Sequence, residues 1–270
     1  SSLMAKFLGD LDAKSEFQKL ISTEILLKTI RLMINGVNEY DPSLIEFVQK
    51  MIQAPSKKSM LNLFNKSQND LSQHNQSSKI DQLLRGQRGG FFAEAGGYDG
   101  EYQSNTVFFE LKRDWTGLLI EPMPHLYQRM LNKKRHVYAI NACIADKRPF
   151  VAQLVVADVF SGMESEMSAY RSFRLRASPT EPSLVYVPCF SLNTIMRALN
   201  RTTIDYFSLD VEGGELRILK SIDFQKLNIR SFSIEWFSRN STKQQIQEIL
   251  EQNGYWLRQE DHSDFYFTKK

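Results

Sequence analysis

Glycines and one acid follow the first apolar segment of the chain that is typical of a strand, in the stretch Glu94-Ala-Gly-Gly-Tyr-Asp-Gly100. Glycine at such a place allows a positive φ or a very close approach of the backbone to something else. The stretch could therefore be only a tight turn, or it could let backbone amides and the Glu94 carboxylate face a ligand ahead of a helix. Gly96, Gly97 and Gly100 do not complete the G-x-G-x-x-G pattern, which disfavours a pyrophosphate ligand.

A second acid, Glu121, ends the next predicted strand, 27 residues after Glu94. An acid at this place can accept hydrogen bonds from both hydroxyls of a ribose. An acid at the tip of the first strand would repel a phosphate group but would pair with an amino group. S-adenosylmethionine has a ribose and an amino group and no phosphate, so we expect it to be the cofactor.

Three further predicted strands also end in acids. Asp146 follows the third strand, in Asn141-Ala-Cys-Ile-Ala-Asp146, where it could accept a hydrogen bond from an adenine amine. Asp210 and Glu212 follow the fourth strand, and Glu235 closes the fifth. Each acid alone could be a helix cap or a solvated turn, but their recurrence at successive strand ends favours a nucleoside site.

Methyl transfer to a hydroxyl requires a general base, and we expect Asp210 or Glu212 to supply it. A cation held by Asp210, Glu212 and Glu235 is an alternative, because hard cations bind carboxylate oxygens. We take the general base as the prediction and expect no metal.

Alternating strand and helix patterns from Gly89 onward would position these residues. Because ligands of open α/β sheets bind at the carboxyl ends of the strands, the alternation predicts a mostly parallel sheet with helices on both faces and a closing antiparallel hairpin. The expected strands are Phe91–Ala95, Gly117–Glu121, Val137–Ala145, Asp205–Asp210, Arg230–Phe237, Tyr255–Arg258 and Phe265–Thr268. The expected helices are Tyr102–Arg113, Pro124–Asn132, Leu192–Asn200, Glu215–Ser221 and Thr242–Asn253.

Two amphipathic helices are predicted ahead of this domain, one over residues 15 to 36 and one beginning at Asp41-Pro42. Residues 65 to 79 are almost entirely polar, which predicts a flexible linker. We therefore divide the chain into a helical extension at 1–64, a linker at 65–87 and the α/β domain at 88–270. The helices of the extension could bind a protein partner.

The net charge of +3 is too small to indicate a nucleic-acid partner. No apolar run approaches the roughly 20 residues that a membrane span requires. Because the chain begins Ser1-Ser2-Leu3 without an initiator methionine, we expect a preceding segment, which leaves open a signal or membrane anchor there.

The motifs quoted above, together with Ile120-Glu-Pro122 and Asp205-Tyr-Phe-Ser-Leu-Asp-Val-Glu-Gly-Gly-Glu215, resemble the FkbM-type methyltransferases over roughly residues 88 to 269. The resemblance implies a Rossmann-like class I fold with a seven-stranded sheet, S-adenosylmethionine, and O-methylation of a hydroxyl or carboxyl group on a sugar-like or small substrate. It implies that Glu94 and Gly96 hold the methionine end, Glu121 the ribose and Asp146 the adenine side. With the residue pattern described above, we predict a cofactor site of Glu94, Gly96, Gly97, Tyr98, Gly100, Glu121, Pro122, Asn141, Asp146 and Asp210.

The chain departs from the family at Tyr98-Asp99 and at Ser208, where a lysine is common. A tyrosine at position 98 could line the cofactor site or block it. The absence of the lysine keeps open a second hypothesis, a non-catalytic interaction or trafficking module with the same fold.

The sequence is most similar to the animal branch related to Star, which implies a domain in the secretory lumen or at the cell surface, with a cytoplasmic location as the alternative. In the lumen Cys143 and Cys189 would form a disulfide. Sequons at Asn65, Asn75, Asn200 and Asn240 agree weakly with this location. The polar segment from Phe160 to Pro182 could be a flap over the site or plain surface.

Overall fold

The computed structural model describes residues 21–270 except 66, 68–69, 145, 157–161, 164–182, 212, 237–239 and 262. Glu212, residues 15 to 20 of the first predicted helix, and all of the predicted flap except Gly162–Met163 lie outside the described residues. No described helix is both long and apolar enough to cross a membrane.

A seven-stranded sheet forms the centre of the molecule, in the order β12-β13-β11-β9-β1-β2-β3. Five neighbouring strands are parallel, whereas β13 runs antiparallel to β11 and to β12. This confirms the mostly parallel sheet with a closing hairpin. The strands are β1 (Phe91–Ala95), β2 (Thr116–Ile120), β3 (Tyr138–Ile140), β9 (Tyr206–Leu209), β11 (Ser231–Glu235), β12 (Tyr255–Asp261) and β13 (Asp264–Lys269).

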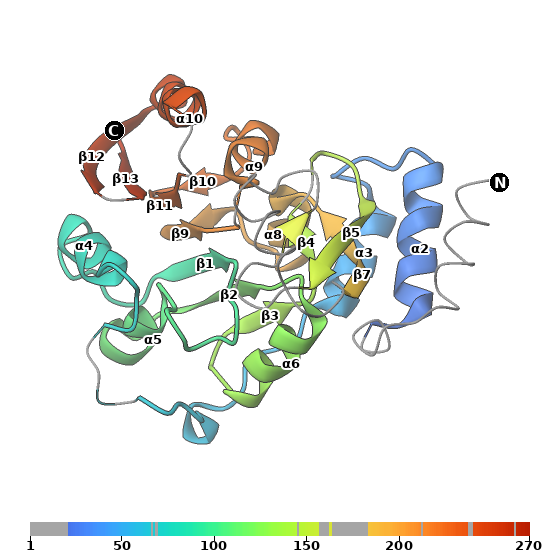
Figure 1. Cartoon of the computed structure of the whole chain (residues 1–270), viewed down its shortest axis with the longest axis horizontal. Helices are drawn as coiled ribbons and strands as arrows, with labels where there is room; N and C mark the ends of the chain where they lie inside the picture. Colours follow the sequence, from blue (N-terminus) through green and yellow to red (C-terminus); the bar gives the residue numbers. More distant parts are fainter. Residues whose placement is uncertain are drawn as a thin grey trace.

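Helices cover both faces of this sheet (Figure 1). One face packs against α4 (Gln76–Leu83), α5 (Val107–Arg113) and α6 (Pro124–Asn132) through a cluster that contains Ile80, Phe109 and Met130. The other face packs against α3 (Pro42–Met51), α8 (Leu192–Ala198), α9 (Glu215–Ser221) and α10 (Asn240–Gln252). Every residue of β1 is buried, as expected for a strand at the centre of a sheet covered on both faces.

A second sheet lies beside the first, in the order β4-β7-β5-β6. Its strands are β4 (Cys143–Ile144), β5 (Phe150–Val156), β6 (Gly162–Met163) and β7 (Ser183–Phe190). The structure also contains a short parallel pair, β8 (Thr203–Ile204) with β10 (Asn228–Ile229), and the 3-10 helix η2 (Lys58–Met60).

The predicted third strand, Val137–Ala145, is wrong as a single strand. The chain leaves β3 at Ile140, turns at Asn141, and enters the second sheet as β4. The Asn141 side chain donates to the carbonyl oxygens of Glu121 and Pro122, at 2.8 and 2.9 Å, and this fixes the turn. Apolar periodicity runs through the whole segment and does not reveal which sheet each half joins.

The described part of the N-terminal region forms two helices, as predicted. The first, α2 (Thr23–Ile34), begins after Ser22, whose hydroxyl caps the amide of Glu24. This helix packs on β5 and β7 through Leu26 and Ile30, and α3 packs on α8. Their apolar faces are therefore buried against the α/β domain itself.

The segment predicted as a flexible linker contains α4 instead. Its polar side chains bond to one another and to the domain: Asp70 accepts from Ser72 and Ser78, and the Ser77 hydroxyl donates to the carbonyl oxygen of Asn105. Ile80 is buried against the sheet. Composition underestimated this order because hydrogen bonds, rather than apolar area, hold the start of the segment in place.

Candidate functional site

A cavity opens at the carboxyl ends of β1, β2 and β9, where the order of the strands reverses. Part of its lining is apolar, here called the apolar side, and comes from both sheets, α6 and α9. The apolar residues include Ile120, Met123, Leu126, Ala142, Cys143, Ile144, Leu154 and Ile218. The polar lining residues include Glu94, Ser104, Asn105, Ser208 and Asp210, which we call the polar side.

Glu121 lies at the end of β2 and is 4 % exposed. Its Oε1 accepts from the amide of Met123 and its Oε2 from the amide of Tyr98, both at 2.8 Å. Burial raises the pKa of Glu121 to about 8, although the two amides partly counter this. Because each carboxylate oxygen has two lone pairs, both oxygens can accept one further hydrogen bond from a ligand.

Glu94, at the end of β1, is buried and organises the loop ahead of α5. Its Oε2 accepts from the hydroxyls of Ser104 and Thr106, and its Oε1 accepts from the amide of Asn105 at 2.7 Å. Three of about four acceptor positions of this carboxylate are therefore occupied by the protein. Burial raises the pKa of Glu94, whereas Arg135, at 3.8 Å, and these three donors lower it.

Arg135 links the loop between β1 and α5 to α5 itself. It is 4 % exposed, pairs with Glu110 at 2.7 Å, and donates to the carbonyl oxygen of Gly100 and to the hydroxyls of Ser104 and Thr106. A buried cation with this many partners holds the loop in one arrangement.

The glycines after β1 serve close packing. Gly96 has φ +84°, and a Cβ there would lie 1.8 Å from the carbonyl oxygen of Asp210. A Cβ at Gly97 would lie 2.7 Å from the side chain of Met130. The tight loop thus brings the end of β1 against the end of β9, which places Glu94 and Asp210 at one cavity.

The expectation that amides of this loop face a ligand is wrong for those of Gly96, Gly97, Tyr98 and Gly100. The first two donate to the carbonyl oxygen of Ile120, that of Tyr98 to Glu121, and that of Gly100 to the carbonyl oxygen of Gly97. Tyr98 has φ +48° and lines the cavity, with its ring 5.8 Å from that of Tyr102.

The cavity brings together most of the residues predicted for the cofactor: Glu94, Gly96, Gly97, Tyr98, Glu121, Pro122 and Asp210. Gly100 and Asn141 do not line it: a Cβ at Gly100 would lie 3.0 Å from the side chain of Met130, and Asn141 bonds to the segment after β2. Asp146 is also outside the lining: its side chain is 64 % exposed and lies 3.8 Å from Arg217, which does line the cavity.

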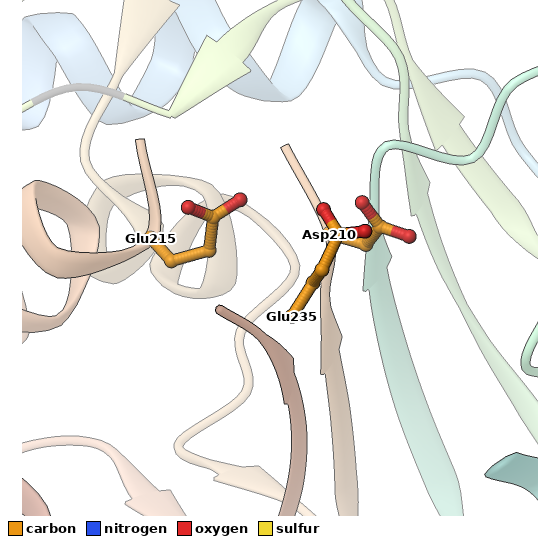
Figure 2. Close-up of side chains that lie close together, drawn as sticks. All are labelled: Asp210, Glu215 and Glu235. Atoms are coloured by element: carbon orange, nitrogen blue, oxygen red, sulfur yellow. The ribbon is translucent and has the colours of Figure 1, made fainter. Parts of the chain in front are cut away.

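A cluster of three carboxylate side chains lies beside the cavity, near the ends of β9 and β11. Oxygens of Asp210, Glu215 and Glu235 lie within 4.8 Å of one another (Figure 2). Glu215 was not among the acids predicted for this cluster, and the predicted Glu212 lies outside the described residues. The Oε1 of Glu215 accepts from the amides of Val211 and Gly213, and burial raises the pKa of Glu215 to about 7. The cluster could bind a hard cation, but acids gather at sheet edges without one, so we assign no ion.

Ser104 and Asn105 were missed by sequence reasoning because they fall inside the helix expected over Tyr102–Arg113. That helix begins only at Val107. The Ser104 hydroxyl accepts from the amides of Thr106 and Val107, an alternative to helical bonding that serine favours. The signal available in the sequence was the run Ser104-Asn105-Thr106, whose side chains compete with the backbone of a helix.

The family model described as the methyltransferase FkbM domain matches residues 94–257, more than half of the chain. No curated protein matches the chain significantly.

Solved structures similar to the chain include three methyltransferases. A human methyltransferase 10 domain containing protein is 11% identical with a TM-score of 0.38, and the match covers 72% of this chain and 79% of that one. A precorrin-6y C5,15-methyltransferase from Geobacter metallireducens is 11% identical with a TM-score of 0.38, covering 80% of this chain and 97% of that one. A SAM-dependent methyltransferase from Aquifex aeolicus is 11% identical with a TM-score of 0.36, covering 86% and 100%. The strand order and the family match together identify the fold.

Proposed function

Because the chain belongs to the family of FkbM-domain methyltransferases, we propose that it transfers a methyl group from S-adenosylmethionine to a hydroxyl or carboxyl group of a sugar-like or other small substrate. Its sheet is that of the Rossmann-like class I methyltransferase fold. The observation that carries the proposal is the buried Glu121 carboxylate at the end of β2, on the wall of the cavity at the strand ends.

The cavity fits a nucleoside cofactor without phosphate. Its apolar side suits an adenine ring, and Glu121 retains acceptor capacity for the ribose hydroxyls. A phosphate-bearing dinucleotide fits poorly, because the amides of Gly96 and Gly97 are engaged within the protein and two acids, Glu94 and Asp210, line the polar side.

When bound, S-adenosylmethionine supplies an electrophilic methyl group on a sulfonium. The protein has to hold the acceptor atom in line with that methyl and exclude water, since positioning lowers the barrier of a direct displacement. We assign to Asp210 the role of general base, which takes the proton of the acceptor hydroxyl as the new bond forms. Asp210 is suited to this because it lines the polar side, on a segment fixed by contact with Gly96.

Calorimetry with S-adenosylmethionine and S-adenosylhomocysteine tests the proposal. Wild type is expected to bind both, and Glu121→Ala to lose at least tenfold in affinity, because it lacks the ribose acceptor. Glu101→Gln is the matched control: Glu101 is also a buried acid, but it pairs with Lys133 outside the cavity. Wild type that binds neither compound would remove the proposal, and binding without transfer to any acceptor would favour the non-catalytic module.

We also propose that this domain works in the secretory lumen or at the cell surface. Cys143 and Cys189 form a disulfide between β4 and β7, and such bonds persist in oxidising compartments. Asn65, Asn75 and Asn200, each in a sequon, are exposed. Protein from a secretory host should show the disulfide-linked peptides in mass spectrometry without reductant, and two free thiols would contradict this location.

A further inference from the structure

Asn105 is on the polar side of the cavity, and its side-chain Oδ1 accepts no hydrogen bond from any described residue. It is 7 % exposed, and its Oδ1 is buried without a hydrogen-bond donor. Its other polar groups are engaged: the amide donates to Glu94, the carbonyl oxygen accepts from Ser77, and Nδ2 donates to the hydroxyl of Ser208 at 2.9 Å.

The unserved Oδ1 points to a ligand. Buried polar atoms of proteins are paired in the great majority of cases, and leaving one unpaired is unfavourable. The neighbouring residues hold Asn105 in place but do not donate to its Oδ1, because Glu94 and Ser77 bond to its backbone and Ser208 to its Nδ2. A ligand that brings an N–H or O–H donor to this wall would complete the set.

The surroundings select a cationic donor. Glu94 and Asp210 line the cavity together with Asn105. Arg217, the one cation among the described lining residues, donates to the carbonyl oxygen of Ile144 at 3.3 Å. Arg135 lies 3.8 Å from Glu94 but does not line the cavity, so the polar groups at the cavity include two acids and the Asn105 oxygen. This set favours an ammonium group over a carboxylate. The amide of Asn105 also binds Glu94, so the acid fixes the position of the residue that meets the ligand.

We propose that Asn105 Oδ1 accepts a hydrogen bond from the α-ammonium group of the amino-acid end of the cofactor, with Ser208 orienting the amide. Glu94 then acts on the ammonium by its charge and through Asn105, with most of its acceptor positions engaged by the loop. The inference rests on the proposed function, since it requires that the cavity binds S-adenosylmethionine.

Three probes separate the parts of the cofactor: S-adenosylhomocysteine, its decarboxylated analogue, which keeps the amine, and 5′-methylthioadenosine, which has neither group. In Asn105→Ala we expect the Kd of the first two to rise by about 10- to 100-fold, as for a lost hydrogen bond to a charged group. The Kd of methylthioadenosine should stay within threefold. Ser208→Ala should show the same pattern with a smaller rise, because Oδ1 remains but is less well oriented.

The stability of the ligand-free variants provides a second readout. Asn105→Ala should melt within about 2 °C of wild type, because the lost hydrogen bond from Nδ2 to Ser208 is offset by removal of the buried, unpaired Oδ1. Asn193 is the matched control, a buried asparagine whose Oδ1 accepts from the amide of Asp223 and whose Nδ2 donates to its carbonyl oxygen. Asn193→Ala should melt about 5 °C lower and bind all three probes as wild type does.

Several outcomes would overturn the inference while leaving the proposed function intact. These are unchanged affinity of Asn105→Ala for all probes, an equal loss for all three, or a loss confined to S-adenosylhomocysteine, which would place the carboxylate at Asn105. Wild type that binds none of the probes would instead remove the proposed function itself.

Discussion

The disulfide between Cys143 and Cys189 should contribute strongly to stability, and its contribution can be worked out from its place in the chain. The two cysteines are 46 residues apart and are directly paired in the ladder of β4 and β7. Closing a loop of this length in the unfolded chain corresponds to about 4 kcal/mol at 25 °C. Because β4 has only two residues, it forms only a short ladder with β7, and the disulfide is the one covalent link between these two strands.

The variant that carries both Cys143→Ser and Cys189→Ser should therefore lose about 4 kcal/mol in the free energy of unfolding, measured by urea titration without reductant. Wild type treated with reductant should show the same loss, and reductant should not affect the variant. Because Cys143 also lines the cavity, the variant should bind S-adenosylhomocysteine more weakly than wild type. Wild type whose urea midpoint is insensitive to reductant would refute this reasoning.

Three further perturbations test the packing and charges around the cavity. Gly96→Ala should lower the free energy of unfolding by at least about 3 kcal/mol, because its Cβ would meet the carbonyl oxygen of Asp210. Gly254→Ala should lower it by only about 1 kcal/mol of backbone strain, because Gly254 has φ +83° and nothing lies within 4 Å of the added Cβ. Equal losses in urea titrations would contradict the role of the contact between Gly96 and Asp210. The pKa of Glu121 is raised to about 8, so the folded protein keeps a proton that the unfolded chain loses near pH 4.5. The free energy of unfolding without ligand should therefore fall by up to about 5 kcal/mol as the pH rises between these values. If the melting temperature of Glu121→Gln depends on pH as strongly as that of wild type over this range, Glu121 is excluded as the cause. Arg135→Met should lower the free energy of unfolding by about 3 to 5 kcal/mol, because it leaves buried acids without their cation. Arg113→Met, which removes a partly exposed ion pair, should lower it by about 1 kcal/mol or less. Similar losses for both variants in chemical denaturation would contradict a larger contribution from the buried ion pairs.

The sequence predicted the sheet well because its strands are short, apolar and separated by clear turn and helix signals. The boundaries of β1, α6 and α9 agree with the prediction at both ends. The division of residues 137 to 145 between two sheets could not be predicted, because both halves are apolar and the turn depends on where Asn141 finds its acceptors.

The acids of the site were predictable as a set, since parallel strands bring their carboxyl ends to one edge. The detailed roles were not. Glu94 lines the cavity, as expected, yet most of its acceptor positions are taken by Ser104, Asn105 and Thr106. Which oxygen of a buried acid stays available depends on hydrogen bonds between residues 10 to 12 positions apart, and no local pattern encodes that.

Order in the polar segment 70–78, which includes the start of α4, was also missed, and the reason is physical. Residues such as Ser72, Gln76 and Ser77 read as solvated in isolation, but Gln76 binds Asp264, 188 positions away. Contacts over such separations depend on the completed fold.

The central claim is that the cavity at the strand ends holds S-adenosylmethionine with Glu121 on the ribose. A crystal structure of the protein with S-adenosylhomocysteine tests it most directly. We predict both ribose hydroxyls within hydrogen-bonding distance of the Glu121 carboxylate and the adenine against the apolar side formed by Met123, Leu126 and Ile144. Density for the ligand at any other place, or none in crystals saturated with it, would contradict the account.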